Sequence, residues 1–249
     1  NWNPFTYKTH YVDWIKRWIY YSFVTLTERR AFRYLKFLIS NSNATNEIIS
    51  NNYNIPNEKI RTIYLGIDLD INPLDEVIEK QRKENPILLF VGGNIQRKGL
   101  QTVLILLPKL KQSYPSLQLH VIGKNQNTER IKKRSDLMGL TECVKYFGWI
   151  PPQEMKKYYR RSTVFVMPSL MEGFGLVFLE AMAQGLPVIG GKTGGTVELI
   201  KNNKNGILVK PDNEKELSQA ILCLLNKDKL RKNIIQNGYE TVKIYQSQK

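Results

Sequence analysis

The chain has 249 residues, 42% of them hydrophobic, which is enough for one large domain or for one and a half domains of ordinary size. Its 37 Lys and Arg residues outnumber 22 Asp and Glu residues. The net charge of +15 indicates an anionic partner such as a nucleotide, a nucleic acid or an anionic membrane surface. We expect no membrane-spanning helix and no signal peptide, because no apolar run approaches the ~20 residues that cross a bilayer. The first residue is Asn1 rather than Met, so we expect a fragment of a longer protein.

The first 38 residues are rich in aromatic and basic side chains. Helical spacing over residues 28–38 sets Phe32 and Leu35 on one side and basic residues on the other, which predicts helices that pack against the rest of the protein. A basic amphipathic helix on an anionic lipid surface is the alternative. Nucleic-acid binding is less favoured, because no RRM, KH or zinc-finger pattern accompanies the basic residues.

Residues 39–85 contain shorter elements. The pattern predicts a strand end at 39–42, a helix at 44–51, a strand at 59–65, and a linker with a surface helix in the proline-bounded stretch 71–85. We divide the chain into a first unit, residues 1–66, and a second unit, residues 67–249.

From Pro86 onward, apolar runs that suit strands alternate with segments of helical spacing. The predicted strands are residues 87–91, 117–122, 144–147, 164–167, 187–189 and 206–209. The predicted helices are residues 100–112, 128–137, 152–160, 176–183, 196–201 and 214–225, with a last helix from about residue 230. This alternation predicts an α/β fold, a Rossmann-like, doubly wound parallel sheet of about six strands, whose carboxyl-end loops open on one crevice.

The stretch from Val164 to Leu186 carries the strongest functional pattern. An apolar strand is followed by a loop that contains Gly173 and Gly175, and good helix formers continue from Leu176. The N–H groups of Phe174, Gly175 and Leu176 should point into the crevice, with the positive end of the helix dipole behind them. The pattern is typical of a phosphate or sugar-phosphate site.

Two carboxylates lie in this stretch, Glu172 in the loop and Glu180 in the helix. An ionised carboxylate only accepts hydrogen bonds, so it matches a diol that donates two. Such a pair beside an anion-binding helix start could hold two sugar rings, one on each side of a diphosphate. Alternatively, Glu172 is an ordinary acid near a helix N-terminus and Glu180 is a solvated helical residue.

A second candidate loop runs from Gly92 to Gly99 and contains Gly93, Arg97 and Lys98. Glycines allow a ligand to approach the backbone closely, Arg binds phosphate as a fork, and Lys binds it as a point charge. The loop lacks the Gly-Lys-Ser/Thr ending of a P-loop. It also lacks the G-x-G-x-x-G pattern, which removes the main support for a nicotinamide enzyme. A solvated basic loop is the alternative.

Weaker patterns open on the same crevice. Gly148, Trp149 and Ile150 follow a predicted strand and could offer backbone groups to a base, or they could form a rigid turn with a packed Trp. Gly123-Lys124 and the glycine-opened helix start at residues 194–198 give similar signals.

We expect no metal site and no Ser or Cys nucleophile. The D-x-D pattern of residues 68–70 lies in the linker, which we place away from the crevice strands, and His10 and His120 are isolated. Cys143 and Cys223 are far apart in apolar stretches, so they predict small core residues in a reducing compartment rather than a disulfide or a metal site.

Together, five segments resemble the carboxyl-terminal, donor-binding half of a GT-B glycosyltransferase, and more narrowly the retaining glycosyltransferase family four group. They are Gly92–Gly99, Phe147–Ile150, Pro168–Ser169, Glu172–Ala183 with its E-x7-E spacing, and Gly206–Pro211. Residues 41–42, 59–61 and 64–68 match the usual junction from the first domain. The resemblance covers about residues 28–238, and its most specific part is the E-x7-E segment in a strand–loop–helix context.

This resemblance implies a nucleotide-diphosphate sugar as donor, an acceptor hydroxyl, retention at the anomeric carbon, and no metal or other cofactor. It implies catalytic roles for Glu172 at the transferred sugar and for Lys98 and Arg97 at the diphosphate, whose developing charge they would stabilise. Glu180 would bind the ribose diol. The base would lie near Gly148, Trp149 and Ile150. The other implied donor-binding residues are Gly92, Gly93, Gly173, Phe174, Gly175 and Leu176.

The sequence departs from the family pattern at two points. Gly93 stands where the family often has an arginine, so either Arg97 substitutes for it or the donor affinity is weaker. The family's first domain is much longer than residues 1–66, and it holds the acceptor pocket and a histidine whose role we do not assign to His10. We therefore expect the chain to bind the donor nucleotide and to turn over little by itself.

The resemblance favours a retaining hexosyltransferase, cytoplasmic or peripheral at a membrane. Such an enzyme would use a UDP- or GDP-sugar to build a glycolipid, a polysaccharide or a similar glycoconjugate. Two other classes stay open: a non-catalytic nucleotide-binding or scaffold domain of the same fold, and a charge-driven binder of a membrane surface or nucleic acid. An inverting GT-B enzyme is disfavoured, because by family analogy the E-x7-E pair points to retention.

Overall fold

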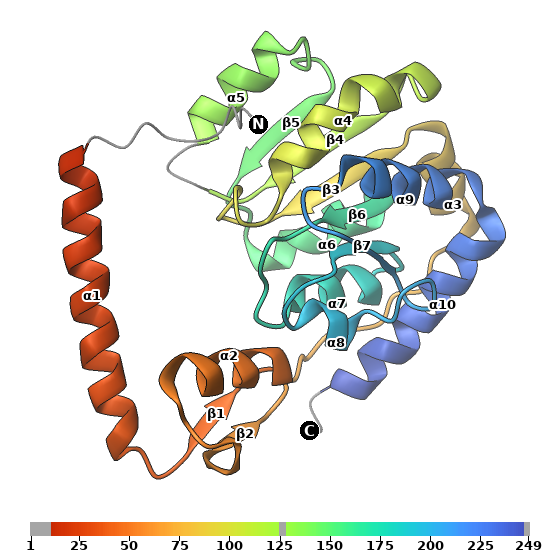
Figure 1. Ribbon diagram of the computed structural model, residues 1–249. Helices are drawn as coiled ribbons and strands as arrows, with labels where there is room; N and C mark the ends of the chain where they lie inside the picture. Colours follow the sequence, from red (N-terminus) through yellow and green to blue (C-terminus); the bar gives the residue numbers. More distant parts are fainter. Residues whose placement is uncertain (1–10, 125–127, 247–249) are drawn as a thin grey trace. The chain divides into compact units, whose positions relative to one another are not determined.

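A computed structural model describes residues 11–124 and 128–246 of the chain (Figure 1). These residues form two compact units. The first unit contains the described residues up to Ser40 together with Asn46–Ile63, and the second contains Asn41–Thr45 together with the described residues from Tyr64 onward. His10 lies outside the described residues.

The first unit combines a long helix with a small parallel sheet. Its elements are α1 (Tyr11–Tyr34), β1 (Leu38–Ser40), most of α2 (Asn43–Tyr53), η1 (Asn57–Lys59) and β2 (Ile60–Thr62). The helix predicted over residues 28–38 is wrong at its end, because α1 stops at Tyr34 and Leu38 pairs with Ile60 in the sheet. Phe32 packs inside this unit: its ring lies edge-on to that of Tyr53, with centroids 4.6 Å apart.

The second unit is built on a doubly wound parallel sheet, as the sequence predicts. The strand order is β5-β4-β3-β6-β7-β8, and all neighbours are parallel. The strands are β3 (Ile87–Val91), β4 (Gln118–Ile122), β5 (Val144–Gly148), β6 (Val164–Met167), β7 (Val188–Gly191) and β8 (Ile207–Val209). All four residues of β6 are buried, because helices cover both faces of the sheet and leave no strand face for polar side chains.

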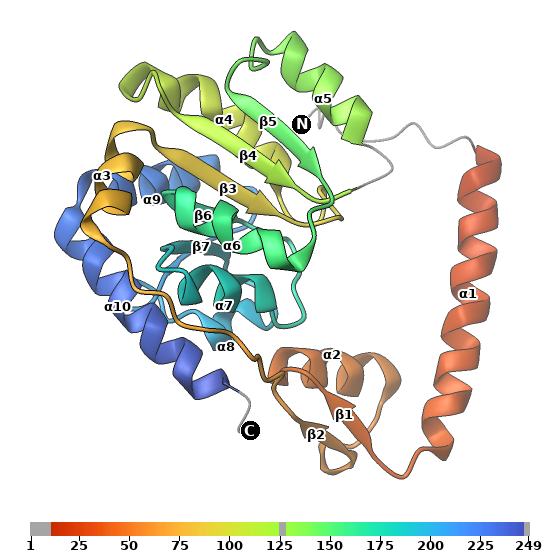
Figure 2. The same cartoon turned by 180° about the vertical axis from the view of Figure 1, so that it is seen from behind.

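Helices α4 and α9 lie on one face of the sheet, and α6 and α7 lie on the other (Figures 1 and 2). The helices of this unit are α3 (Glu76–Glu84), α4 (Leu100–Ser113), α5 (Thr128–Leu137), α6 (Pro152–Arg161), α7 (Leu176–Ala183), α8 (Thr196–Leu199), α9 (Glu214–Asn226) and α10 (Asp228–Tyr245). Helix α10 packs on α7 and α9, and α3 packs on α6. Within the described residues, no helix combines the length and the apolar character needed to span a membrane.

The centre of the sheet is a topological switch point. β3 and β6 are neighbours, and the chain proceeds from β3 to β4 and β5 on one side and from β6 to β7 and β8 on the other. Ligands of doubly wound sheets bind outside the carboxyl ends of the strands at such a point. The loops that follow β3 and β6 are residues 92–99 and 168–175, the two segments singled out in the sequence.

Backbone contacts hold these loops together. The Leu170 N–H donates to the Arg97 carbonyl at 2.8 Å, and the Gly195 N–H donates to the Glu172 carbonyl at 2.9 Å. A Cβ atom at Gly195 would lie 2.0 Å from the Gly173 carbonyl oxygen, which is far inside contact distance. The loops after β6 and β7 can therefore approach this closely only because residue 195 is glycine.

Replacing Gly195 by Ala should lower the free energy of unfolding by at least ~2 kcal/mol, because the new methyl group overlaps backbone that cannot rotate away. The matched control is Gly139→Ala. Gly139 has φ +72° and nothing within 4 Å of the position that a methyl group would take, so this change should cost only the ~1 kcal/mol of a left-handed alanine. Urea unfolding measures both changes. A loss at Gly195 no larger than that at Gly139 would contradict the proposed overlap.

Candidate functional site

Glu172 and Lys98 come from the two central loops and face each other. The Lys98 Nζ lies 3.6 Å from the Glu172 Oε2, and each side chain is only 13% exposed. The distance is that of an ion pair, and the Glu172 Oε2 is buried without a hydrogen-bond partner among the described residues. Because a carboxylate oxygen can accept two hydrogen bonds, Glu172 keeps acceptor capacity for the hydroxyl groups of a ligand.

Arg97 joins the same two loops. Its Nη1 donates to the Met171 carbonyl at 2.9 Å, and its backbone N–H donates to the Asn94 side chain at 3.1 Å. The contact with Met171 fixes the guanidinium beside the loop that carries Glu172 while it uses only one of the five guanidinium donors. Arg97 is therefore an anchored cation with spare donors.

The start of α7 has the geometry of an anion-binding helix terminus. Gly175 is the N-cap residue with φ +95°, and the Phe178 N–H donates to its carbonyl at 2.9 Å. The N–H groups of Leu176 and Val177 belong to the first turn, where a helix offers no internal acceptor. The Phe174 side chain, 2% exposed, is buried and so anchors the loop, whereas the sequence pattern assigned a role only to its N–H.

Glu198 in α8 supports the Phe174 loop, a role that the sequence pattern did not reveal. It accepts hydrogen bonds from the N–H groups of Asn43 and Ala44 at 3.0 and 2.8 Å and from the Tyr64 hydroxyl at 2.8 Å. Burial raises the pKa of Glu198, but these donors outweigh it, and the net pKa is lowered. The carboxylate in turn raises the pKa of Tyr64 to about 12. The Tyr64 ring packs on that of Phe174, with centroids 5.5 Å apart.

Glu180 projects from α7 toward α6. The Tyr159 hydroxyl donates to the Glu180 Oε2 at 2.7 Å. Burial, followed by the charge of Glu180, raises the pKa of Tyr159 well above 10, so this hydroxyl remains a donor at neutral pH. Glu180 is therefore more than a solvated helical residue, since one of its carboxylate oxygens has a fixed protein donor. The sequence gives no signal for Tyr159, which lies at a core position of α6.

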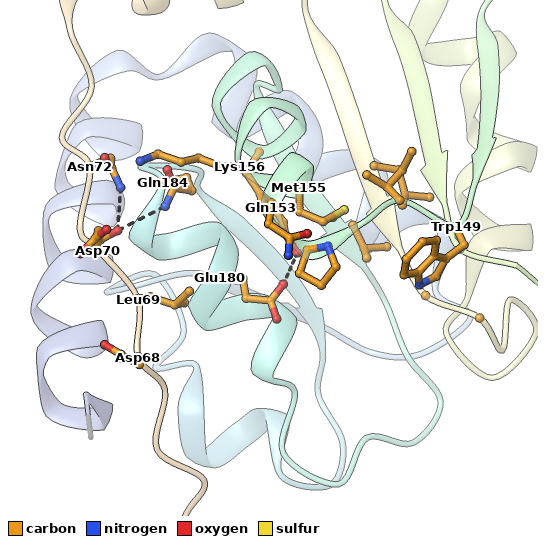
Figure 3. A pocket seen from close by; sticks show the side chains of 18 of the residues that line it. Asp68, Leu69, Asp70, Asn72, Trp149, Gln153, Met155, Lys156, Glu180 and Gln184 are labelled. Carbon is orange, nitrogen blue, oxygen red and sulfur yellow. Dashed lines mark hydrogen bonds between the residues drawn. The ribbon is translucent and has the colours of Figure 1, made fainter. Parts of the chain in front are cut away.

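A cavity of about 630 Å³ opens at the switch point and gathers five of the predicted residues. They are Gly92, Gly93, Trp149, Ile150 and Glu180. Trp149 lies at one end of the cavity and Gln184 at the other, with Glu180 between them (Figure 3). Trp149 is 69% exposed, so the alternative of a packed tryptophan is wrong.

Other predicted residues lie outside the lining of this cavity. Gly148 lines a neighbouring cavity of about 330 Å³ together with Lys124 and Lys132. The remaining predicted residues belong to the two central loops and the first turn of α7 and are not part of the lining; they are Arg97, Lys98, Glu172, Gly173, Phe174, Gly175 and Leu176. The site therefore has two parts, a cavity at Glu180 and a charged loop pair at Glu172.

The prediction that the D-x-D segment lies away from the crevice is wrong. Asp68 and Asp70 both line the cavity (Figure 3). The segment lies there because the Gln184 side chain donates to the Asp70 carbonyl at 3.3 Å and the Asn72 N–H donates to the Ala183 carbonyl at 2.8 Å. Within the described ranges, no group of three or more His, Cys, Asp or Glu residues could hold a metal ion.

The isolated histidine and the cysteines have no place in the site. His120 is half-buried in β4, where its ring packs against Phe147 with centroids 5.0 Å apart. Burial lowers the pKa of His120 to about 4, so its ring is neutral at pH 7. Cys143 is buried as predicted, Cys223 is half-buried, and both are free thiols.

Comparison with known protein families identifies the class. The family described as "Glycosyl transferases group 1" matches residues 73–241, and the family "Glycosyltransferase Family 4" matches residues 3–71. The first match spans more than half of the chain. The chain therefore belongs to the group 1 glycosyl transferases and consists mainly of the carboxyl-terminal, donor-domain region of the GT-B fold.

Individual proteins agree with this class. An uncharacterized glycosyltransferase of Methanocaldococcus jannaschii is 30% identical over 214 residues, which are 82% of this chain and 55% of the relative. A GDP-mannose-dependent alpha-(1-6)-phosphatidylinositol monomannoside mannosyltransferase of Mycobacterium tuberculosis is 30% identical over 149 residues, 57% of this chain and 39% of the relative. The structure of Anabaena HepE in complex with UDP and glucose matches 86% of this chain and 60% of its own, with a TM-score of 0.73 and 24% identity. The chain thus spans about half or less of the length of these curated relatives.

Replacing Glu198 by Gln should flatten the acid side of the stability profile. A carboxyl whose pKa is lower in the folded than in the unfolded protein contributes stability above its unfolded pKa, ordinarily about 4.5. That contribution is lost as the pH falls through the folded pKa. We expect the urea midpoint of the wild-type protein to fall more steeply below pH 4.5 than that of Glu198→Gln.

The matched control for this change is Glu240→Gln, since Glu240 forms an exposed pair with Lys243 one turn away. This variant should keep the wild-type profile. Parallel acid profiles for the wild type and Glu198→Gln would show that the three hydrogen bonds at Glu198 do not shift its pKa.

Proposed function

We propose that this chain carries the donor site of a retaining hexosyltransferase that moves a sugar from a nucleotide diphosphate to an acceptor hydroxyl. The observation that carries the proposal is the convergence of two differently supported carboxylates on one switch point. Glu180 borders a cavity lined by Gly92 and Gly93, and Glu172 is paired with Lys98 beside the start of α7. A nucleotide sugar offers two diols on either side of a diphosphate, which matches this order of groups.

In the proposed arrangement, Glu180 accepts hydrogen bonds from the ribose diol and the base lies toward Trp149. The diphosphate lies at the amino end of α7, where the helix dipole and the free N–H groups favour an anion. Lys98 and Arg97 stabilise the negative charge that develops on the leaving diphosphate, and Glu172 orients the transferred sugar. The leaving phosphate helps to take the acceptor proton, so that neither a metal ion nor a covalent protein nucleophile is required.

The relatives support a UDP- or GDP-sugar as donor and a glycolipid or glycan as acceptor. The mycobacterial relative is GDP-mannose-dependent and acts on a phosphatidylinositol monomannoside, and the HepE structure holds UDP and glucose. The net charge of +15 would suit a cytoplasmic enzyme that works at an anionic membrane surface. The matched relatives are longer than this chain. In our proposal, selection of the acceptor depends on a region that corresponds to their unmatched part.

Calorimetric titration with UDP, GDP, ADP and TDP tests the donor site without an acceptor. We expect saturable binding of UDP or GDP in EDTA, with no gain on addition of Mg²⁺. Lys98→Ala and Glu180→Ala should each weaken the binding about tenfold or more, because each change removes a charge-assisted contact. Lys109→Ala, which removes an exposed lysine of α4 outside the cavity, is the matched control and should leave the affinity unchanged.

Other outcomes would identify the competing classes. No binding of any of the four nucleotides would contradict a donor site in this chain, and a strict requirement for Mg²⁺ would contradict a metal-free one. Equal weakening by Lys109→Ala, together with a steep dependence on salt, would indicate non-specific attraction by the net charge. Nucleotide binding together with undiminished transfer by a full-length Glu172→Ala variant would indicate a scaffold domain.

A further inference from the structure

Arg82, a residue of α3 that is 5% exposed, makes contacts that the proposed function does not use. Its guanidinium donates to the carbonyls of Arg160 at 3.0 Å and Tyr159 at 3.1 Å. It also donates to the carbonyls of Gly185 at 2.7 Å and Gln184 at 3.5 Å. In the described part of the chain, no carboxylate forms an ion pair with Arg82.

The four carbonyls belong to two helix ends. Tyr159 and Arg160 are in the last turn of α6, and Gln184 and Gly185 directly follow α7. Carbonyls at a helix C-terminus carry partial negative charge and lack internal donors, so a buried cation between two such ends stabilises both. Burial lowers the pKa of Arg82 to about 9, which leaves the guanidinium charged at neutral pH.

The same two helices carry the hydrogen bond at the ribose carboxylate. Tyr159 contributes its carbonyl to Arg82 and its hydroxyl to the Glu180 Oε2, 2.7 Å away. Glu180 lies one turn before Gln184, whose carbonyl is another acceptor of Arg82. The guanidinium therefore fixes the spacing of α6 and α7 at the level where Tyr159 meets Glu180.

We propose that Arg82 is a positioning residue of the donor site, which holds α6 and α7 so that the Tyr159 hydroxyl orients Glu180 toward the ribose diol. The identity of the ligand rests on the proposed function, whereas the coupling of Arg82 to Tyr159 rests on the contacts alone. Lysine would not replace Arg82, because a point charge cannot serve four acceptors on two helices as a planar fork does.

Binding of UDP and GDP, compared with their 2′,3′-dideoxy counterparts, tests the positioning role. The wild-type protein should prefer the ribose forms. Arg82→Lys and Tyr159→Phe should each weaken binding of the ribose form about tenfold and leave binding of the dideoxy form within about twofold. Lys83→Met changes the next residue of α3, an exposed partner of Asp228, and should leave both affinities unchanged.

A merely structural role of Arg82 gives a different result. Arg82→Lys would then lower the unfolding temperature and weaken both nucleotide forms equally, and that outcome would overturn the proposal. If Arg82→Lys does not fold, Arg82→Gln, which keeps two amide donors at this position, takes its place in the same comparison.

A double-mutant cycle of unfolding tests the coupling without any nucleotide. The losses of unfolding free energy in Arg82→Lys and Tyr159→Phe should not add in the double variant, because Arg82 and the Tyr159 hydroxyl hold the same two helices, α6 and α7, together. Additive losses would overturn the proposal. Non-additive losses in a protein that binds no nucleotide would refute the proposed function and leave the coupling of Arg82 to Tyr159 in place.

Discussion

The site depends on direct contact between the backbones of loops that follow different strands. A parallel sheet places the carboxyl ends of its strands at one edge, but it fixes only where each loop begins. The position of Glu172 is fixed further on, where its carbonyl accepts the Gly195 N–H at 2.9 Å and its neighbour Gly173 touches Gly195. Because this bond joins backbone to backbone, a shift of β7 relative to β6 would move Glu172 directly.

The two carboxylates have unlike surroundings, which suit unlike tasks. Glu180 receives a hydrogen bond from a buried tyrosine and borders a cavity, so it is held as a fixed acceptor. Glu172 has a lysine at 3.6 Å, and among the residues that the structure describes its Oε2 has no hydrogen-bond partner, so it is held mainly by charge. A fixed acceptor would suit the ribose of the proposed donor, whose chemistry would not change during transfer. A carboxylate with free acceptor capacity would suit the proposed transferred sugar, whose geometry would change at the transition state.

The sequence predicts the central strand, loop and helix well because local residues determine them. The bounds of β6 and α7 agree with the prediction, since an uninterrupted apolar run, two glycines and a run of strong helix formers leave little choice. The end of α1 was missed, because the short apolar run after Tyr34 fits either a helix or a strand by spacing alone. Residues 38–40 form a strand because they pair with β2, which lies about 20 residues further along the chain.

The supporting residues could not be predicted because their partners are distant in the sequence. Arg82 acts on carbonyls more than 70 residues away, and Tyr159 acts on Glu180 from another helix. Glu198 accepts hydrogen bonds from the N–H groups of residues 43 and 44. Nothing in the sequence of its own short helix, which begins after Gly195, indicates such partners. The placement of residues 68–70 likewise follows from contacts with the end of α7. These contacts involve the backbone of the segment, so its sequence does not reveal them.

The net charge of the chain is a poor guide to the electrostatics of this site. Lys98 is paired with Glu172, so the net charge of the pair is small, and Lys98 would act on a bound diphosphate through direct contact of its ammonium group. The stabilisation of a proposed leaving diphosphate would then depend on this contact, on the amino end of α7 and on Arg97, which its contact with the Met171 carbonyl keeps in place. Such groups need no reorganisation when charge develops, which is the property that makes fixed dipoles and anchored cations effective in catalysis. The net positive charge of the chain would attract the anionic partner. The fixed dipole of α7 and the anchored Arg97 would stabilise the transition state more than the bound substrate.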